Sequence, residues 1–286
     1  MNKMDDVKLT KLKYIAAKAR YLAVKTVIGS GLGHLGGSLS SIDILTVLYF
    51  NVLNITKDDL TNPDRDRFIL SKGHASVGLY SIFALKGFIS EELLFTFRKN
   101  GSILSGHPEP GIPGIEHGTG SLGHGLSVGL GMALAAKINK QKYNTYVLLG
   151  DGELQEGQVW EAAMCAAHNK LDNLTAIVDR NNLQMDGSTE EILGLENLKL
   201  KWGAFGWKIK SVNGHSISQL IKVLKNSPNQ DGMPTVIIAH TIKGKGVDFM
   251  ENQVKWHGGA PKGEEADHAL DQLEKQLLKT SKYLKC

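Results

Sequence analysis

Short apolar runs alternate with amphipathic stretches along most of this chain of 286 residues. The apolar runs predict strands at 67–70, 145–149, 174–178, 207–212 and 234–239. Apolar positions at helical spacing predict helices at 8–28, 41–51, 75–86, 90–98, 126–138, 157–170, 216–225 and 264–284, with glycine-rich segments at 29–37 and 101–125 between them. This alternation predicts an α/β fold whose doubly wound, mostly parallel sheet carries helices on both faces.

Polar residues follow two of the predicted strands directly. Gly150-Asp151-Gly152 ends the strand 145–149, and Asn181-Asn182 follows the strand 174–178, with the helix 157–170 between them. A strand–helix–strand crossover is almost always right-handed and makes its strands parallel, so Asp151 and Asn181 should emerge together at the carboxyl edge of the sheet. Either dipeptide alone is more often a turn, but the two together favour a ligand site.

The chemistry of these residues suits a metal-bound diphosphate. A carboxylate, an amide oxygen and a nearby backbone carbonyl form a partial shell of oxygens, and Mg²⁺ takes its remaining ligands from phosphates and water. The glycines on either side of Asp151 let phosphate oxygens approach the backbone amides closely.

Composition restricts the class of protein. With 42% hydrophobic residues, 22% charged residues and 32 glycines, the chain can bury a large core, and we expect one large domain over residues 1–286. The net charge of +4 is small, and the lysines are spread out rather than clustered with aromatic residues. This distribution argues against nucleic-acid binding, while a mild positive bias suits phosphorylated ligands.

Cysteines and apolar segments indicate the compartment. Cys165 and Cys286 show no pairing pattern, which suggests a reducing, cytoplasmic environment. The N-terminus is charged throughout, and the longest apolar stretch, 42–55, is interrupted by Asp43, Asn51 and Asn54. We therefore expect neither secretion nor membrane insertion.

Two matches to the dinucleotide fingerprint G-x-G-x-x-G, at 31–36 and 118–123, are a rival signal. The fingerprint needs a strand before it and a helix after it, whereas the first match follows a helix and the second follows a loop. The context argues against a nicotinamide cofactor.

Several histidines stand beside glycine in predicted loops: His34, His74, His107, His124 and His257. One such histidine is as often structural as functional, but several together can converge on a polar ligand and donate hydrogen bonds to its oxygens. On predicted helices or in a turn, His168, His268 and His215 keep a structural interpretation. His117 and His240 stay open.

The chain resembles, almost end to end, the N-terminal, pyrophosphate-binding portion of transketolase. The segments that carry the resemblance stand in the family's order: GHLGGSLSSIDIL (33–45), DRFILSKGHASVGLY (66–80), GHPE (106–109), GTGSLGHG (118–125), GDGELQEG (150–157) with NN (181–182), and WHGGAPKGEEADHAL (256–270). It departs from the common single-chain pattern at Lys72, at His124 and in a longer loop at 244–256. These departures bear on substrate selection rather than on cofactor binding.

The resemblance implies a set of site residues for thiamine diphosphate. Mg²⁺, which Ca²⁺ or Mn²⁺ could replace, would be bound by the side chains of Asp151 and Asn181 and the backbone carbonyl of Leu183. The implied cofactor contacts further include His74, Gly120, Ser121, Leu122, Gly150, Gly152, Glu153, Ile242 and His257. The implied catalytic residues are His34 and His107 at the C1 and C2 oxygens of the donor ketose, His74 and His257 near the reacting carbons, and Glu156 in a proton network between paired cofactor sites.

The resemblance also implies a partner. Transketolases continue into a second, pyrimidine-binding domain and a third domain, both absent from this chain, and the second supplies the glutamate that activates the cofactor. We therefore expect a split enzyme with a C-terminal partner subunit, as a heterotetramer of two copies of each chain. It would transfer a two-carbon ketol unit from a ketose phosphate to an aldose phosphate, as in the pentose phosphate pathway.

Other functions remain open at this point. One alternative is a transketolase-like enzyme for an unusual sugar, and another is the α-type component of a 2-oxoacid dehydrogenase. The GHPE loop and the histidines count against the latter, because a decarboxylase has no polyol donor to hold. A thiamine diphosphate-binding regulator without catalysis is a third alternative, although it would not require His34, His107 and His257.

Overall fold

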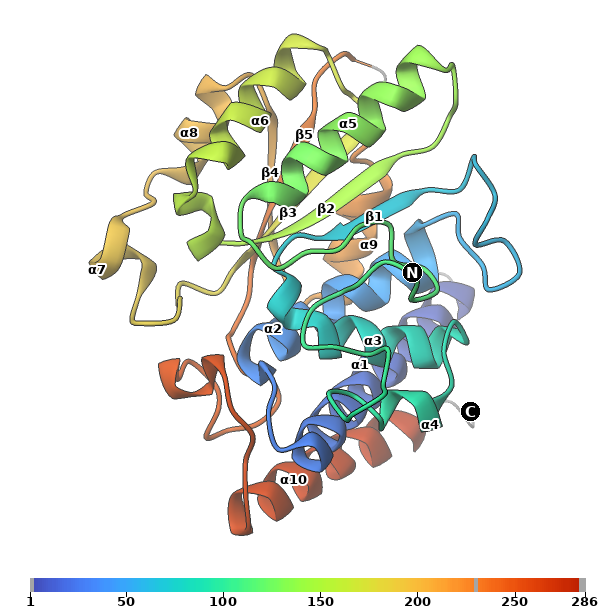
Figure 1. The fold of residues 1–286 in the computed structure, drawn as a ribbon, viewed down its shortest axis with the longest axis vertical. Helices are drawn as coiled ribbons and strands as arrows, with labels where there is room; N and C mark the ends of the chain where they lie inside the picture. The colour runs from blue at the N-terminus through green and yellow to red at the C-terminus, as the bar shows by residue number, and fades with distance from the viewer. Residues whose placement is uncertain (1–2, 229–230, 283–286) are drawn as a thin grey trace.

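The computed structural model describes residues 3–228 and 231–282. Its centre is a sheet of five parallel strands in the order β1-β2-β3-β5-β4 (Figure 1). The strands are β1 (Arg67–Leu70), β2 (Thr145–Gly150), β3 (Leu174–Arg180), β4 (Lys208–Asn213) and β5 (Thr235–His240). All five predicted strands are present within a residue or two of their expected bounds, and the prediction of a parallel α/β sheet is confirmed.

Helices cover both faces of the sheet, because its central strands are apolar on both sides. One face packs against α5 (His124–Ile138), α6 (Gly157–His168) and α8 (Leu198–Ala204) around a buried cluster that includes Trp202 and Val147. The other face packs against α2 (Leu35–Val47) and α9 (Ile217–Lys225), and α3 (Ser76–Lys86) lies beside α2. The strands are therefore buried on both sides, as the apolar runs predicted.

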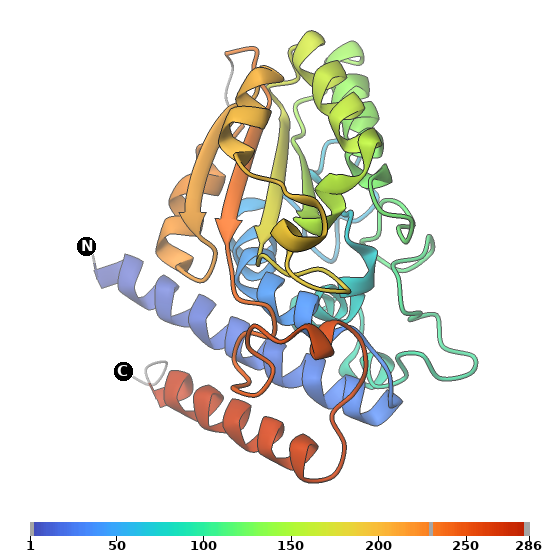
Figure 2. The same cartoon turned by 90° about the vertical axis from the view of Figure 1, so that its left-hand side faces the viewer.

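A further layer covers α2 on the side away from the sheet. It consists of α1 (Lys3–Ser30) and α10 (Glu264–Ser281), which lie side by side and run antiparallel (Figure 2). The expected helix 264–284 ends earlier than predicted in the described chain, and its last residues lie outside the described residues, as does Cys286. The other cysteine, Cys165, is exposed on α6.

The prediction for the segment after α1 was wrong. We expected a glycine-rich loop to 37 and a helix over 41–51, but α2 already begins at Leu35, directly after His34, and a π-helical turn, Leu48–Val52, extends it. Every residue of α2 is buried. Gly36 and Gly37 are tolerated in this helix because neighbouring groups approach so closely that tertiary packing outweighs their low helix propensity.

Two further elements differ from the predictions. The expected helix 90–98 is reduced to α4 (Glu91–Leu94), which Ser90 caps, followed by turns that end at Arg98 with a positive φ of 58°. The short helices α7 (Thr189–Leu193) and α8 were not predicted. Few apolar residues fall at helical spacing in such short elements, so the sequence pattern is weak there.

One segment, Leu35–Val52, is long and apolar enough to cross a membrane by length and composition alone. Within the fold, however, 83% of this segment is buried. It is therefore packed as the central helix of the protein's own core.

The packing of α5 on the sheet depends on small residues. A Cβ atom on Gly129 would lie 2.4 Å from Cγ2 of Val147 in β2, whereas a Cβ on Gly131, two residues further along the same helix, would meet nothing within 4 Å. Gly129 therefore allows close helix–sheet contact, and Gly131 is free of that constraint.

We expect the two glycines to respond in opposite directions to alanine. Gly129→Ala should lower the free energy of unfolding by about 1 to 3 kcal/mol through overpacking. Gly131→Ala should raise it by about 0.5 to 1 kcal/mol, since alanine is the better helix former. Urea denaturation of both variants checks this, and equal effects would contradict the assigned packing.

Candidate active site

Side chains from the carboxyl ends of β1, β2, β3 and β5 meet in one cavity of about 490 Å³. Gly150, the last residue of β2, pairs with Asp179 of β3, so Asp151 and Asn181 follow neighbouring strand ends. Both are buried, and together with Leu183 they line the cavity. The predicted juxtaposition of Asp151 and Asn181 is thus present in the structure.

Backbone and side-chain donors hold Asp151 in place. Its Oδ1 accepts a hydrogen bond from the Gly152 amide at 2.9 Å, and its Oδ2 accepts one from the Asn182 amide at 2.6 Å. The Arg180 guanidinium lies 3.3 Å from Oδ2. Burial and the nearby Asp179 carboxylate nevertheless raise the pKa of Asp151, so a cation in the cavity would stabilise its charged form.

A buried ion pair lies behind these ligands. Lys72, two residues after the end of β1, donates to the Asp179 carboxylate of β3 and to the Gly37 carbonyl of α2 at 2.9 Å. Although burial opposes it, the adjacent ammonium holds the pKa of Asp179 below its ordinary value. The pair joins β1, β3 and the first turn of α2.

A second lysine faces the same cavity. Lys243 follows β5, and its Nζ donates to the Leu183 carbonyl at 3.1 Å and contacts His257 Nδ1 at 2.9 Å. Burial and the nearby Lys72 lower the pKa of Lys243 to about 8. A cation therefore already faces the Leu183 carbonyl, which is one of the three oxygens predicted to bind metal.

Four of the glycine-flanked histidines form one cluster. The ring centroid of His34 lies 5.5 Å from that of His74, 6.3 Å from that of His107 and 5.7 Å from that of His257, and the rings of His74 and His257 are 5.1 Å apart. They come from four separate segments: the start of α2, the turn after β1, the loop around 107 and the turn Val254–His257. All four line the cavity, as the convergence hypothesis predicted, whereas the fifth, His124, is exposed at the start of α5 and is not among the lining residues.

The surroundings of His34, His74 and His257 favour the neutral form of each imidazole. Burial lowers the pKa of His34, and His107 and Arg98 add to the effect. Burial and Lys72 lower the pKa of His74 well below its ordinary value. Burial and Lys243 lower the pKa of His257 to about 3. At neutral pH these rings therefore act as uncharged hydrogen-bond donors or acceptors.

Gly36 and Gly37 allow the first turn of α2 to lie close to the neighbouring side chains and backbone of the cavity. A Cβ on Gly37 would lie 3.3 Å from His74 Nε2 and 3.4 Å from Lys72 Nζ, and a Cβ on Gly36 would lie 2.6 Å from the Trp256 carbonyl. A larger residue at Gly36 would force α2 away from the Trp256 backbone, and one at Gly37 would displace the ends of His74 and Lys72 slightly. These contacts explain why the first turn of α2 contains two glycines.

The remaining predicted cofactor residues fall into two groups. Gly120, Leu122, Gly150, Gly152 and Glu153 line the cavity, whereas Ser121 and Ile242 are not among its lining residues. The Ile242 amide instead donates to His215 Nε2 at 2.9 Å. The roles assigned to Ser121 and Ile242 stay predictions.

The two predicted glutamates differ in environment. Glu153 is buried, accepts from the Gly123 amide at 2.9 Å and the Gly150 amide at 3.0 Å, and contacts Ser71. It therefore ties the glycine-rich loop to the end of β2. Glu156 lines the cavity but is exposed, so its carboxylate is free to meet a group outside this chain, as its proposed network requires.

The other histidines lie outside the cavity. His215 bridges Asp43 and the Ile242 amide, which supports its structural interpretation. His268 contacts Asp248 at 3.1 Å, and His168 is exposed at the end of α6. His117, His124 and His240 are exposed, and His240 contacts Ser211 at 3.0 Å.

The donor set fits the predicted metal-bound diphosphate. Among the described residues, no group of three or more His, Cys, Asp or Glu side chains is arranged to hold a metal ion. The candidate ligands are instead one carboxylate, one amide oxygen and one carbonyl, a set that needs further oxygens from a bound phosphate. Lys72 and Lys243 supply the positive charge that an anionic diphosphate requires.

Sequence reasoning missed Lys243 and noted Lys72 only as a departure from a pattern. Lys72 lies two residues and Lys243 three residues beyond the end of its strand, whereas Asp151 and Asn181 follow their strands directly. The strand-end signal that identified Asp151 and Asn181 is therefore weaker for the two lysines.

The fold and cavity define a class: an α/β domain with a diphosphate-binding site at the carboxyl edge of a parallel sheet. The transketolase thiamine diphosphate binding domain matches residues 12–277, and the chain belongs to this family. A relative from Phocaeicola vulgatus, named as one chain of an apulose-4-phosphate transketolase, is 46% identical over 271 residues, 95% of this chain and 96% of that protein. A relative from Clostridium sp., named as one chain of a 6-deoxy-6-sulfo-D-fructose transketolase, is 41% identical, over 93% of this chain and 97% of that protein.

Solved structures agree with this assignment. The transketolase of Campylobacter jejuni superposes with a TM-score of 0.86 at 33% identity, covering 100% of this chain but 47% of that one. The chain thus spans about half the length of this solved transketolase and nearly the full length of the two relatives that are separate transketolase chains. It is a thiamine diphosphate-binding, N-terminal transketolase subunit, which confirms the resemblance drawn from the sequence.

The lowered pKa of His257 makes stability depend on pH. When the pH falls below about 6.5, the ordinary pKa of histidine, the His257 ring binds a proton in the unfolded chain but stays neutral in the folded chain. The free energy of unfolding should therefore fall as the pH falls toward 3. We expect His257→Gln to lose less stability than wild type between pH 7.5 and 5. Urea denaturation at both pH values measures the difference.

The matched control is His168→Gln, which removes an exposed histidine. Its loss of stability between the two pH values should equal that of wild type. If His257→Gln showed the same loss as wild type, the imidazole of His257 would not be held neutral by its surroundings.

Proposed function

We propose that this chain forms half of the active site of a transketolase built from two kinds of chain. In this proposal a partner chain supplies the pyrimidine-binding domain, and two copies of each chain assemble into a cytoplasmic heterotetramer. The observation that carries the proposal is the placement of four imidazoles and two lysines around the buried oxygens of Asp151 and Asn181. A site for the cofactor alone would not need His34 and His107.

Mg²⁺ is the proposed metal, because all the candidate ligands are oxygens and one of them is anionic. Asp151, Asn181 and the Leu183 carbonyl would hold it, and the Lys243 ammonium would turn from this carbonyl toward the diphosphate. Lys72 stays paired with Asp179 and adds positive charge to the wall of the cavity. The Gly152 amide, which donates to Asp151 Oδ1, lies at the start of a short 3₁₀ turn and would turn from this carboxylate to a phosphate oxygen when Asp151 binds the metal.

When bound, thiamine diphosphate supplies the carbanion chemistry, and the protein supplies position and charge stabilisation. His34 and His107 are proposed to donate hydrogen bonds to the hydroxyl and carbonyl oxygens of the ketose. Because the pKa of His34 is lowered, its neutral ring can stabilise negative charge on oxygen and accept a hydroxyl proton without first losing one. His257 contacts Lys243 and so acts at both the sugar and the diphosphate ends of the cavity.

The donor sugar is proposed as a class, not as one compound. Histidines at the C1 and C2 oxygens recognise what ketoses share, whereas contacts with the far end of the sugar would lie on the partner. Relatives named for apulose 4-phosphate and for 6-deoxy-6-sulfo-D-fructose favour an unusual sugar over the pentose phosphate pathway alone.

Mixing the two kinds of chain tests the proposal. The purified chain should show no ketol transfer, and a mixture with a chain carrying the second and third transketolase domains from the same organism should transfer a two-carbon unit to an aldose phosphate. Xylulose 5-phosphate, apulose 4-phosphate and 6-deoxy-6-sulfo-D-fructose would be compared as donors. Activity of the rigorously purified chain alone would overturn the split-enzyme proposal.

Asp151→Ala serves as the matched variant in this experiment. This substitution removes the anionic metal ligand. It should therefore abolish Mg²⁺-dependent binding of thiamine diphosphate in calorimetric titration, and the mixture that contains the variant should show no ketol transfer. Asp151 lies at a strand end, so circular dichroism should show an unchanged fold. Undiminished affinity would remove Asp151 from the metal site.

The histidine cluster should separate catalysis from cofactor binding. In the assembled enzyme, His34→Ala and His107→Ala should lower turnover by roughly 10² to 10³, comparable to the loss of an oxyanion donor, while thiamine diphosphate affinity stays nearly intact. His257→Ala should weaken both. Steady-state kinetics and calorimetry measure the two effects.

His168→Ala is the control for this series, since the residue is exposed on α6 away from the cavity. Its turnover should equal that of wild type. Wild-type turnover in His34→Ala would favour a cofactor-binding regulator over an enzyme.

A further inference from the structure

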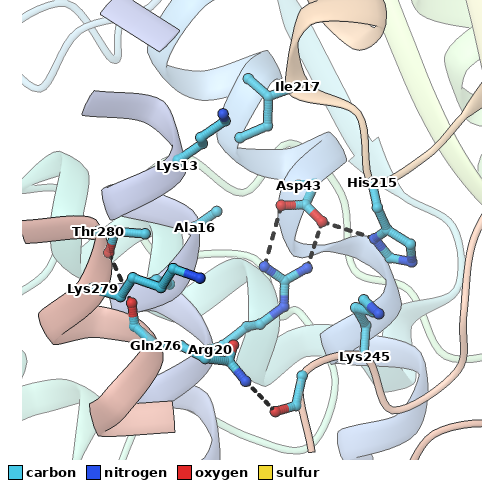
Figure 3. Close-up of a pocket in the computed structure, with 12 residues that line it drawn as sticks. Lys13, Ala16, Arg20, Asp43, His215, Ile217, Lys245, Gln276, Lys279 and Thr280 are labelled. Carbon is cyan, nitrogen blue, oxygen red and sulfur yellow. Dashed lines mark hydrogen bonds and ion pairs between the residues drawn. The ribbon is translucent and has the colours of Figure 1, made fainter. Parts of the chain in front are cut away.

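A second cavity, of about 320 Å³, lies between α1, α2 and α10 (Figure 3). Its walls come from α1, α2, α10, the start of α9 with the turn before it, and the segment around Lys245, and it shares no lining residue with the active-site cavity. The mechanism proposed above does not use it.

A buried ion pair forms the floor of this cavity. The Arg20 guanidinium donates to both Asp43 carboxylate oxygens, at 2.5 and 3.2 Å, and His215 Nδ1 lies 2.8 Å from Asp43 Oδ2 (Figure 3). These contacts use the terminal nitrogens of Arg20. Arg20 is only 7% exposed, and its Nε is buried without a hydrogen-bond partner among the described residues. A buried N–H of this kind favours an acceptor from outside the chain.

Positive charge exceeds negative charge around this donor. Lys13, Lys245 and Lys279 stand around Arg20 in Figure 3, against the single carboxylate of Asp43. Lys245 is paired with Glu251 at 3.0 Å. For Lys13 and Lys279, the described residues provide no ion-pair partner. The cavity therefore has a net positive charge that an anion would neutralise.

The walls indicate what else the anion carries. Ala16, Ala17 and Ile217 are buried and apolar, and the lysine side chains add their methylene groups. The volume is at the lower end of the range for small-molecule sites, so it leaves room for an organic group beside the anion.

We propose that this cavity binds a small phosphate monoester. The terminal oxygens of its phosphate would accept hydrogen bonds from Lys13 and Lys279 and, once the Arg20 side chain shifts to expose its buried Nε, from Arg20, and its organic group would pack on the alanines and Ile217. A phosphate dianion fits better than a carboxylate, because it has three terminal oxygens for three separate donors.

The site is separate from the active site but connected with it. His215 contacts Asp43 at one ring nitrogen and accepts from the Ile242 amide at the other. Ile242 immediately precedes Lys243 of the active-site cavity. The monoester would thus lie against a hydrogen-bonded network that reaches the cofactor site.

Calorimetric titration tests the proposal. The chain, saturated with thiamine diphosphate and Mg²⁺ and held at constant ionic strength with NaCl, is titrated with glycerol 2-phosphate and, separately, with inorganic phosphate. We expect glycerol 2-phosphate to bind with a Kd of about 1 mM or lower, and more tightly than inorganic phosphate, which lacks the organic group. Lys13→Gln/Lys279→Gln should weaken this binding at least about tenfold.

Lys11→Gln/Lys275→Gln is the matched control. It removes the same charge from exposed positions of the same two helices, but neither lysine lines the cavity. Its Kd for glycerol 2-phosphate should equal that of wild type. Equal weakening in both variants, or no binding by wild type up to about 10 mM, would overturn the site. Equal affinity for inorganic phosphate would overturn the monoester assignment.

The outcome is independent of the proposed transketolase activity. The titration is repeated without cofactor, and thiamine diphosphate affinity is measured in both double variants, where it should be unchanged. If the chain fails to bind thiamine diphosphate but glycerol 2-phosphate still distinguishes the two variants, the proposed function fails while this site stands.

Discussion

The buried ion pair between Lys72 and Asp179 is the interaction on which the active site depends. Both side chains are almost inaccessible to water, so their desolvation must be offset by complete hydrogen bonding. The Gly37 carbonyl accepts from the lysine, and Ser40 and Thr241 donate to the carboxylate. The pair thereby joins β1, β3, the segment after β5 and the start of α2. The functional residues His74, Asn181 and Lys243 each lie two positions along the chain from a member of this network.

Charge in the cavity is arranged for an anionic ligand. Two buried lysines face it, while burial and those lysines keep His74 and His257 neutral. Asp151 is the carboxylate that lies among the candidate metal ligands, and its pKa is raised by burial and by Asp179. A nearby divalent cation would stabilise the charged form of such a carboxyl group. The same electrostatics therefore favour both parts of a metal-bound diphosphate.

Helix α2 separates two sites with different chemistry. Its first turn brings His34 and Gly37 to the cofactor cavity, and Asp43, two turns later, holds Arg20 and His215 at the second cavity. Because the whole helix is buried, neither site can shift without disturbing the packing of α2 on the sheet. This arrangement places the second cavity next to the scaffold of the first.

Much of this protein follows from local pattern and from one topological rule. The apolar runs are sufficient to locate all five strands, and the right-handed crossover is sufficient to bring Asp151 and Asn181 together. The start of α2 was not predictable, because Gly36 and Gly37 are poor helix formers and only contacts with His74 and Trp256 favour them there. The histidine cluster and the ion pair of Lys72 with Asp179 bring together segments that are far apart in the sequence. The contact of Lys243 with His257 likewise joins two separate loop positions. Only tertiary packing decides such contacts, since no local preference links residues that meet through the fold alone.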